Sequence, residues 1–429
     1  MFGFANFLLL ALFAAAVFDL IFALARGGGL RGALHGLWNT PHLLFGQQLA
    51  EWRLQLGRIL FAAGLAAYEI SVVFCNSMAR QNWAWVQGVM SPVLEWLAFL
   101  CFGAKILFGT RYTWRELLAG GALYFIARWV YFNSQNIWWI GIVVAVLAAK
   151  DIPLRRPLQV YFASGCSAMA VVLALHFAGI VAPDLTSERM GALRGTYGYG
   201  HPNTFGGLVF GLVLAYALLR AQKVRWVDCL LVFAVGVFLL VGPASRSAAL
   251  CTLALAVGLV FCRLRAGHSV PRWWPGTCAG MVGLTAAVSY LLPLLVIKVG
   301  PWNNDIGPAW LAKLDSLLTC RISLTWMAYR LLDVKIAGQV FNWPTVDNSF
   351  AFALFQFGPV VAALLGILFA AALLGHAKQG RRVEVCCLFA MLAYAYMEVQ
   401  PFHLTTNPTA LLLCGAVFAQ TSARWQKIE

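Results

Sequence analysis

The ten residues from Arg194 to Asn203, RGTYGYGHPN, contain more reactive and ligand-binding residue types than a plain connection between apolar segments needs. Arginine can hold an anion, histidine can move a proton, and three closely spaced glycines let the backbone approach a ligand. Glycine-rich turns also form concavities whose N–H groups bind anions. The stretch therefore predicts an anionic ligand, although the glycines could only form a tight turn, and Asn203 or Thr204 could simply cap the next helix.

Three later polar stretches bring further reactive side chains. The candidate residues in GPASRS, in the segment 300–348 and in the turn around QPFHLTTNP are Ser245, Arg246, Arg321, Asp347, Asn348, Glu398 and His403. A guanidinium stays charged and its planar fork suits phosphate or diphosphate, although Arg246 could also snorkel from the membrane boundary. Asp347 could favour the start of the helix that follows it, accept a proton from an attacking hydroxyl, or do both. We expect Glu398 to pair with an arginine, and His403 to be a polar turn residue.

The segments that position these residues are long and apolar. The chain has 429 residues, of which 61% are hydrophobic and 11% charged, and apolar runs of about 18 or more residues recur along it. Backbone polar groups in lipid must be paired within the segment, and the runs are continuous rather than alternating, so helices are predicted rather than barrel strands. The fold class is therefore all-α, a polytopic membrane protein forming one domain over 1–429 with the lipid bilayer as partner.

About thirteen transmembrane helices are expected, each long enough to cross a bilayer. The spans are predicted at 4–25, 58–79, 92–109, 115–133, 135–150, 157–182, 203–220, 226–242, 247–263, 278–299, 349–375, 383–400 and 408–422. The stretch 27–57 could be a cytoplasmic loop, an interfacial helix or a re-entrant segment. The first run lacks a basic leader and a cleavage site, so it is predicted to be a retained span.

The formal charge of +15 is concentrated in clusters at 105–115, 150–156, 220–225, 263–272, 378–382 and 424–427. These clusters follow every second predicted span, which favours the positive-inside rule over nucleic-acid binding. The rule places the clusters in the cytoplasm, and it places the loop 183–202, the turn GPASRS, the segment 300–348 and the turn 400–408 on the external face. The eleven cysteines show no CxxC spacing, so we interpret them as helix-packing residues rather than metal ligands.

The order of RGTYGYGHPN, GPASRS, DNSFAFALFQFGP and YMEVQPFHLTTNP resembles the O-antigen ligase and Wzy-type polysaccharide polymerase superfamily, particularly its branch in Gram-positive exopolysaccharide and capsule clusters. The resemblance covers roughly residues 100–415. It implies a GT-C-like fold in a bacterial cytoplasmic membrane, with the active site on the external face. It also implies an undecaprenyl-diphosphate-linked glycan as donor and no cofactor, and a chain-length regulator is a possible partner.

The resemblance assigns Arg194, Arg246 and Arg321 to the leaving diphosphate. The ligase branch has His-Asn where this chain has Asp347-Asn348, and its Gly-x-x-Gly survives only as Gly358, with valine in the second place. These departures favour the polymerase branch over a lipopolysaccharide core ligase.

The expected chemistry is attack by a sugar hydroxyl on an anomeric carbon with loss of a diphosphate. Arginines would stabilise the leaving group, and a carboxylate would take the proton. Asp347 is the leading candidate for the base and His201 the second. Because no DxD or ExD motif occurs in an early external loop, we predict a metal-independent reaction. The predicted substrate-binding residues are Arg194, Tyr197, Tyr199, Asn203, Ser245, Asn348, Glu398 and His403.

Two other functions fit the same sequence. A ligase would transfer finished glycan to a different acceptor, and the sequence does not distinguish that acceptor. A flippase or transporter for the lipid-linked glycan is less favoured, because transporters tend to show internal repeats and polar groups at the midplane, whereas the charges here crowd the external rim.

Overall fold

The structure is a computed structural model that describes residues 2–25, 29–46, 49–181, 187–189, 192–296 and 307–418. The first half contains α1 (Phe2–Ala25), α2 (Gly29–Asn39), β1 (His42–Leu43), α3 (Ala50–Cys75), α4 (Ala79–Asn82), the π-helix η1 (Val86–Met90), α5 (Ser91–Phe108), β2 (Arg111–Tyr112), α6 (Trp114–Ser134), α7 (Ile137–Ala148), α8 (Arg155–Phe177), β3 (Ser187–Arg189) and β4 (Ala192–Arg194). The described part is predominantly helical, and its two sheets are the two-stranded pairs β1–β2 and β3–β4. The all-α prediction is confirmed.

The second half contains α9 (Pro202–Leu219), α10 (Trp226–Val241), α11 (Arg246–Leu264), α12 (Trp274–Leu291), the 3-10 helix η2 (Leu292–Leu295), α13 (Ala309–Leu317), α14 (Arg321–Leu331), α15 (Ser349–Phe352), the π-helix η3 (Ala353–Phe357), α16 (Pro359–Lys378), α17 (Arg382–Met397), the 3-10 helices η4 (Gln400–Phe402) and η5 (Pro408–Leu413), and α18 (Cys414–Val417). Parts of the predicted external segments, 183–186, 190–191 and 300–306, lie outside the described residues.

Eight of the described helical stretches are long and apolar enough to cross a membrane. They are α1, α3, the continuous η1–α5 stretch, α8, α9, α11, the continuous α12–η2 stretch and α16. The other predicted spans coincide with helices that are shorter, namely α7, α10, α17 and the η5–α18 stretch, or that carry several charges, namely α6. The chain is therefore a multi-pass membrane protein.

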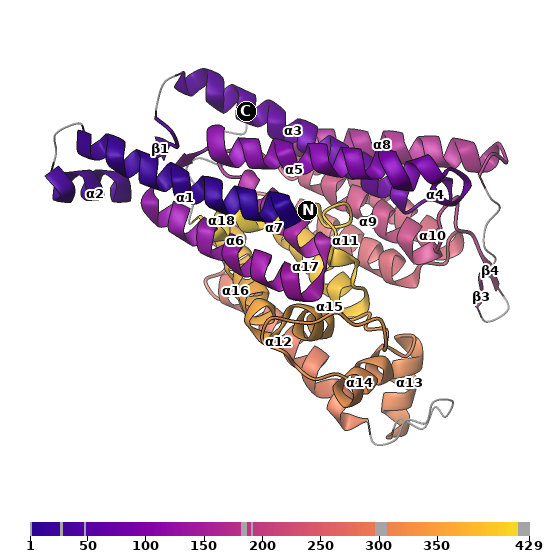
Figure 1. The fold of residues 1–429 in the computed structure, drawn as a ribbon. Helices are drawn as coiled ribbons and strands as arrows, with labels where there is room; N and C mark the ends of the chain where they lie inside the picture. The colour runs from indigo at the N-terminus through magenta and orange to yellow at the C-terminus, as the bar shows by residue number, and fades with distance from the viewer. Residues whose placement is uncertain are drawn as a thin grey trace.

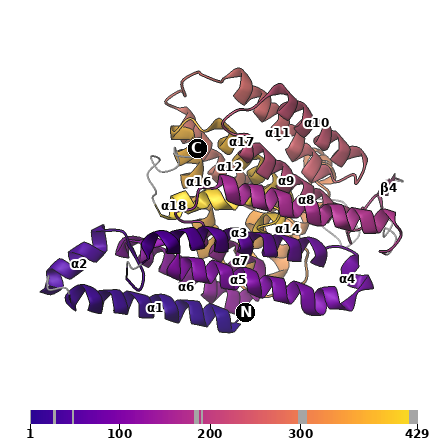
Figure 2. The ribbon, with the colours of Figure 1, turned by 90° about the horizontal axis from the view of Figure 1, so that it is seen from above.

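The long helices pack in a series that brings distant parts of the sequence together. Helix α3 packs on α5 and α8, α8 on α9, and α9 on α11, which also contacts α10 and α17. Helix α17 contacts α16, and α16 packs on α12. Seen from above in Figure 2, α1, α5 and α3 lie on one side of the molecule and α10 and α11 on the other.

Glycines in α9 allow two polar turns to lie directly on this helix. A Cβ at Gly206 would stand 2.3 Å from the Ser245 hydroxyl, and one at Gly211 would stand 2.6 Å from the carbonyl oxygen of Thr405. The missing side chains let the turn before α11 and the segment after α17 approach α9. This close packing assembles the polar site described below.

The predicted span 349–375 is wrong as one continuous helix. It is divided into α15, η3 and α16 at Gly358, whose φ is 88°, and Pro359 begins the new helix. A side chain at Gly358 would stand 2.1 Å from the carbonyl oxygen of Ile336, and Gly338 meets Gln356 equally closely. The segment before α15 therefore crosses the backbone at this break, where only glycine fits.

Residues 27–57 also form more structure than a plain loop. Helix α2 occupies Gly29–Asn39, and α3 begins at Ala50 rather than at the predicted position 58. Between them, β1 pairs antiparallel with β2 at the far end of α5. Figure 1 shows α2 on one side of the molecule and the β3–β4 hairpin, α13 and α14 on the other.

Two lysines of the basic clusters are structural. Lys105 is fully buried and its amine donates to the Thr110 hydroxyl at 2.7 Å and to the carbonyl of Lys150. The amine of Lys150 forms ion pairs with Glu116 and Asp151, each at 3.3 Å. These contacts hold the ends of α5, α6 and α7 together.

Candidate functional site

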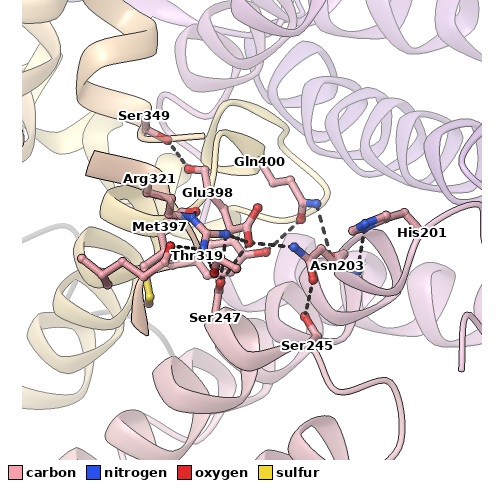
Figure 3. Close-up of polar contacts among 12 residues, drawn as sticks. His201, Asn203, Ser245, Ser247, Thr319, Arg321, Ser349, Met397, Glu398 and Gln400 are labelled. Atoms are coloured by element: carbon pink, nitrogen blue, oxygen red, sulfur yellow. Dashed lines mark hydrogen bonds and ion pairs between the residues drawn. The ribbon is translucent and has the colours of Figure 1, made fainter. Parts of the chain in front are cut away.

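Glu398 is the centre of a polar network that joins four helices (Figure 3). It follows the last residue of α17 and is 5% exposed. Its Oε1 accepts hydrogen bonds from Asn203 Nδ2 at 3.0 Å, Ser247 Oγ at 2.9 Å and Arg321 Nη2 at 2.6 Å. The predicted pairing of Glu398 with an arginine is confirmed, and the partner is Arg321.

The three donors to Glu398 share a position at the start of a helix. Asn203 is the second residue of α9, Ser247 the second residue of α11 and Arg321 the first residue of α14. The first turn of a helix has free N–H groups and the positive end of the helix dipole, which favour negative charge. Three such helix ends around one carboxylate make this a strongly anion-favouring place in the molecule.

Arg321 is fully engaged. Its Nε donates to the carbonyl of Met397, and Nη1 donates to the carbonyl of Leu318 at 2.9 Å and to the Thr319 hydroxyl at 2.8 Å. Its Nη2 donates to Glu398 Oε1 and to the Ser247 hydroxyl. A guanidinium has five N–H donors, so a phosphate could bind to Arg321 only in exchange for one of these partners.

Arg194 joins the same network through an amide. Its Nη2 donates to Asn203 Oδ1 at 2.9 Å and to the carbonyl of Ala244 at 3.3 Å, and the residue is 7% exposed. The hydroxyl of Ser245 lies 3.5 Å from the same Asn203 oxygen. The amide of Asn203 therefore bridges Arg194 on one side and Glu398 on the other.

The structure decides between the two interpretations of Asn203. His201 caps α9, because its Nδ1 accepts a hydrogen bond from the backbone N–H of Asn203 at 3.1 Å. The interpretation of Asn203 or Thr204 as the cap is wrong, and the amide of Asn203 is left for the polar network. As the cap, His201 is exposed at the edge of this network.

Asp347 and Asn348 have different roles. The Asn348 side chain caps α15 by accepting from the backbone N–H groups of Phe350 and Ala351 at 2.9 and 3.1 Å, and it donates to the Ser289 hydroxyl at 3.0 Å. The half-buried carboxylate of Asp347 makes no hydrogen bond or ion pair with the described residues, and it lies near enough to Glu398 for the two charges to repel. Asp347 is therefore available to a ligand.

The two tyrosines of the motif loop contribute to packing beside the network. Tyr197 stacks on Phe205 with ring centroids 5.0 Å apart and also contacts Phe238. Tyr199 is completely buried and also packs on Phe205, with ring centroids 5.6 Å apart. These contacts account for both aromatic rings through packing, and Tyr199 has no surface left for a sugar in this conformation.

Arg246 adjoins the network in sequence, and His403 packs against α7. Arg246 is exposed at the first position of α11, next to Ser247. His403 packs against Trp138, with ring centroids 3.7 Å apart. Among the described residues, no group of three or more His, Cys, Asp and Glu side chains could hold a metal ion.

Comparisons with protein-family models, with curated proteins and with solved structures give no match to this chain.

The sequence did not single out Thr319 and Ser349, which bond to Arg321 and to the carbonyl of Glu398, and it also missed Ser247 and Gln400. Ser247 donates to Glu398, and Gln400 donates through Nε2 to the carbonyl of Asn203 at 3.2 Å while its Oε1 accepts from the Tyr394 hydroxyl at 2.8 Å. Both residues are direct or near neighbours of predicted ones in the same polar turns. That adjacency was the available signal.

An apolar cavity of about 110 Å³ lies beside the network, between α7, α12, α16 and α17. Its wall includes Tyr290, Ser349, Phe350 and Phe402. The hydroxyl of Ser349 donates to the carbonyl of Glu398 at 2.5 Å, so one residue borders both the cavity and the polar network. A polar, anion-favouring site and an apolar space therefore adjoin each other.

Proposed function

We propose that this protein is a membrane glycosyltransferase that polymerises undecaprenyl-diphosphate-linked repeat units on the external face of a bacterial cytoplasmic membrane. The observation that carries the proposal is the convergence of four polar turns on Glu398. They bring Arg194 and Arg321 to three helix N-termini, next to an apolar cavity.

The charges of the network suit a diphosphate. Within the hydrogen-bonded network two buried arginines face one buried glutamate, and the helix dipoles add to this positive charge, while the carboxylate of Asp347 beside Glu398 offsets part of it. An incoming diphosphate would take over hydrogen bonds that Arg194 and Arg321 now give to Asn203 and Glu398. Bonds of this charge-assisted kind are shorter and stronger than neutral ones.

The apolar cavity supports a lipid-linked substrate. At about 110 Å³ it accommodates only a short part of a prenyl chain, next to the diphosphate. The remainder of the chain would lie against exposed apolar side chains of α12 and α16, such as Leu284, Leu291 and Ile367. Such faces are stable in contact with hydrocarbon.

In the proposed reaction, a hydroxyl oxygen of the acceptor sugar bonds to the anomeric carbon of the donor. The bond from that carbon to the phosphate oxygen breaks, and its electron pair leaves with the diphosphate. The proton of the hydroxyl passes to Asp347, which has no competing partner among the described residues. Stabilisation of the leaving group by one well-placed donor is worth about 2.7–4 kcal/mol.

The test is a polymerisation assay with purified protein in nanodiscs, a cognate undecaprenyl-diphosphate repeat unit and EDTA. A product ladder of increasing length supports a metal-independent polymerase. A single transfer to a separate acceptor would replace polymerisation by ligation. Movement of the lipid across a bilayer without a new glycosidic bond would overturn the proposal in favour of transport.

A further inference from the structure

A second cavity lies at the opposite ends of the helices that form the Glu398 network. Its volume is about 760 Å³, and its wall comes from the start of α8, the turns after α9 and α11, and the start of α17. Helices α9, α11 and α17 carry Asn203, Ser247 and Glu398 close to one end and wall residues of this cavity at the other. We call it the basic cavity.

The name reflects the side chains that line it. Six are basic: Arg155, Arg220, Lys223, Arg263, Arg381 and Arg382. The wall contains one acidic side chain, Glu384, in the first turn of α17. Basic residues from four segments that are far apart in the sequence thus line one concave space.

Two of the basic residues already have partners. Arg220 forms an ion pair with Asp228 at 3.2 Å. Arg382 donates to the carbonyl oxygens of Arg265, His268 and Ser269, so its guanidinium holds the loop after α11. These two side chains shape the cavity and are not available to a ligand without loss of those bonds.

The side chains of the other four, Arg155, Lys223, Arg263 and Arg381, form no hydrogen bond or close ion pair with any residue that the structure describes. Arg381 lies near enough to Glu384 for the two opposite charges to attract. Like charges in one concave space repel each other, and an anion between them would remove that repulsion. The positive-inside rule requires basic residues near this face but does not require them to converge on a cavity.

The chemistry of the cavity indicates the class of ligand. Three of the four available cations are arginines, whose planar forks bind phosphate oxygens in pairs. The volume lies in the usual range of small-molecule sites, about 300–1,000 Å³, and apolar residues such as Leu158, Leu218 and Leu412 complete the wall.

We propose that the basic cavity binds a phosphate-bearing anion on the face of the membrane opposite the Glu398 network. The ligand is a phosphomonoester or diphosphate group, supplied either by an anionic lipid headgroup or by a soluble phosphorylated molecule. This proposal does not depend on the glycosyltransferase proposal, because binding alone tests it.

The experiment compares two double variants with equal change in charge. Arg263→Gln/Arg381→Gln removes two available cations of the cavity, whereas Arg156→Gln/Arg272→Gln removes two exposed arginines of the same face that do not line it. Purified proteins in phosphatidylcholine nanodiscs are titrated with inorganic pyrophosphate by calorimetry. In parallel, phosphatidic acid retained by each protein after purification is measured by native mass spectrometry.

Loss of two charged hydrogen-bonding groups is expected to weaken binding by about tenfold or more in the cavity variant, with little change in the control. Pyrophosphate binding identifies a soluble ligand, and retention of phosphatidic acid alone identifies a lipid headgroup. Equal loss in both variants, or no binding of either probe to the wild type, overturns the proposal. Thermal unfolding confirms that both variants remain folded, and Arg263→Lys, which keeps the charge without the fork, should lie between the variant and the wild type.

Discussion

Charged side chains at the two ends of α9, α11 and α17 differ in burial and in pairing. At one end Arg321 and Glu398 are buried, and every N–H of the guanidinium has a partner. At the other end, Arg155 and Arg263 are exposed and make no bond with the described residues. A charge removed from water must be paired and hydrogen-bonded, whereas a hydrated charge needs no partner.

This difference separates residues that hold the structure together from residues that we propose to bind a ligand. Removing one partner of the buried pair leaves an uncompensated charge, and this costs stability. Removing an unpaired cation of the basic cavity costs only binding. Asp347 resembles the second group, because its carboxylate is unpaired although it lies beside the first.

The largest effect is expected for Asp347→Asn, which should reduce polymer formation by about 10²–10⁴-fold, since the amide cannot accept the proton of the attacking hydroxyl. Stability should not change, because the carboxylate makes no bond with the described residues. The measurement is the initial rate of ladder formation at equal protein level. Asp333→Asn is the matched control, because Asp333 is an exposed acid of the same segment before α15. A full rate in Asp347→Asn would eliminate Asp347 as the base.

The next effect concerns the buried pair. Glu398→Ala should lower the free energy of unfolding by about 3–5 kcal/mol, because Arg321 is then buried without its counter-charge. Equilibrium unfolding in detergent measures the loss. The double variant Arg321→Met/Glu398→Leu, which removes both charges, should recover much of it. If Glu398→Ala has the same free energy of unfolding as the wild type, the ion pair does not stabilise the fold.

A smaller loss is expected inside the basic cavity itself. Arg382→Ala should lower the free energy of unfolding by about 1.5–3 kcal/mol, because its guanidinium bonds to carbonyl oxygens of the loop after α11. Limited proteolysis at residues 265–269 should become faster in this variant. An unchanged cleavage rate would contradict the assigned role.

The cap of α15 provides a finer comparison with its neighbour. Asn348→Ala should destabilise the protein by about 1 kcal/mol, because two backbone N–H groups lose their acceptor. Asn348→Asp should retain most of the stability, since the carboxylate can cap the same helix. Equal stability of Asn348→Ala and the wild type would remove the distinction drawn between Asn348 and Asp347.

The smallest effect is expected for Arg263→Gln, within about 0.5 kcal/mol of the wild type, as for ordinary surface substitutions. Thermal unfolding without added phosphate measures it. A larger loss of stability would mean that Arg263 is a structural residue like Arg382, and the contrast between the two ends of the helices would weaken.

The amino-acid sequence predicted the all-α membrane class, because burial of backbone polar groups in lipid leaves long apolar runs no alternative to helices. It also grouped the polar turns that converge on Glu398, since residues at the same ends of successive helices must meet the same face. Both inferences use only local composition and the order of segments along the chain.

The contacts between individual side chains depended on how the helices pack in three dimensions. Asn and His side chains can both cap a helix. In α9 His201 is the cap, and the Asn203 amide bonds instead to Glu398, which is remote in the sequence. Similarly, Lys105 and Arg263 both belong to basic clusters, yet one is buried against Thr110 and the other remains exposed. The break at Gly358 depends on a contact with Ile336. Hydrogen bonds and close backbone contacts are short-ranged in space but unrestricted in sequence separation, so the local pattern could not specify them.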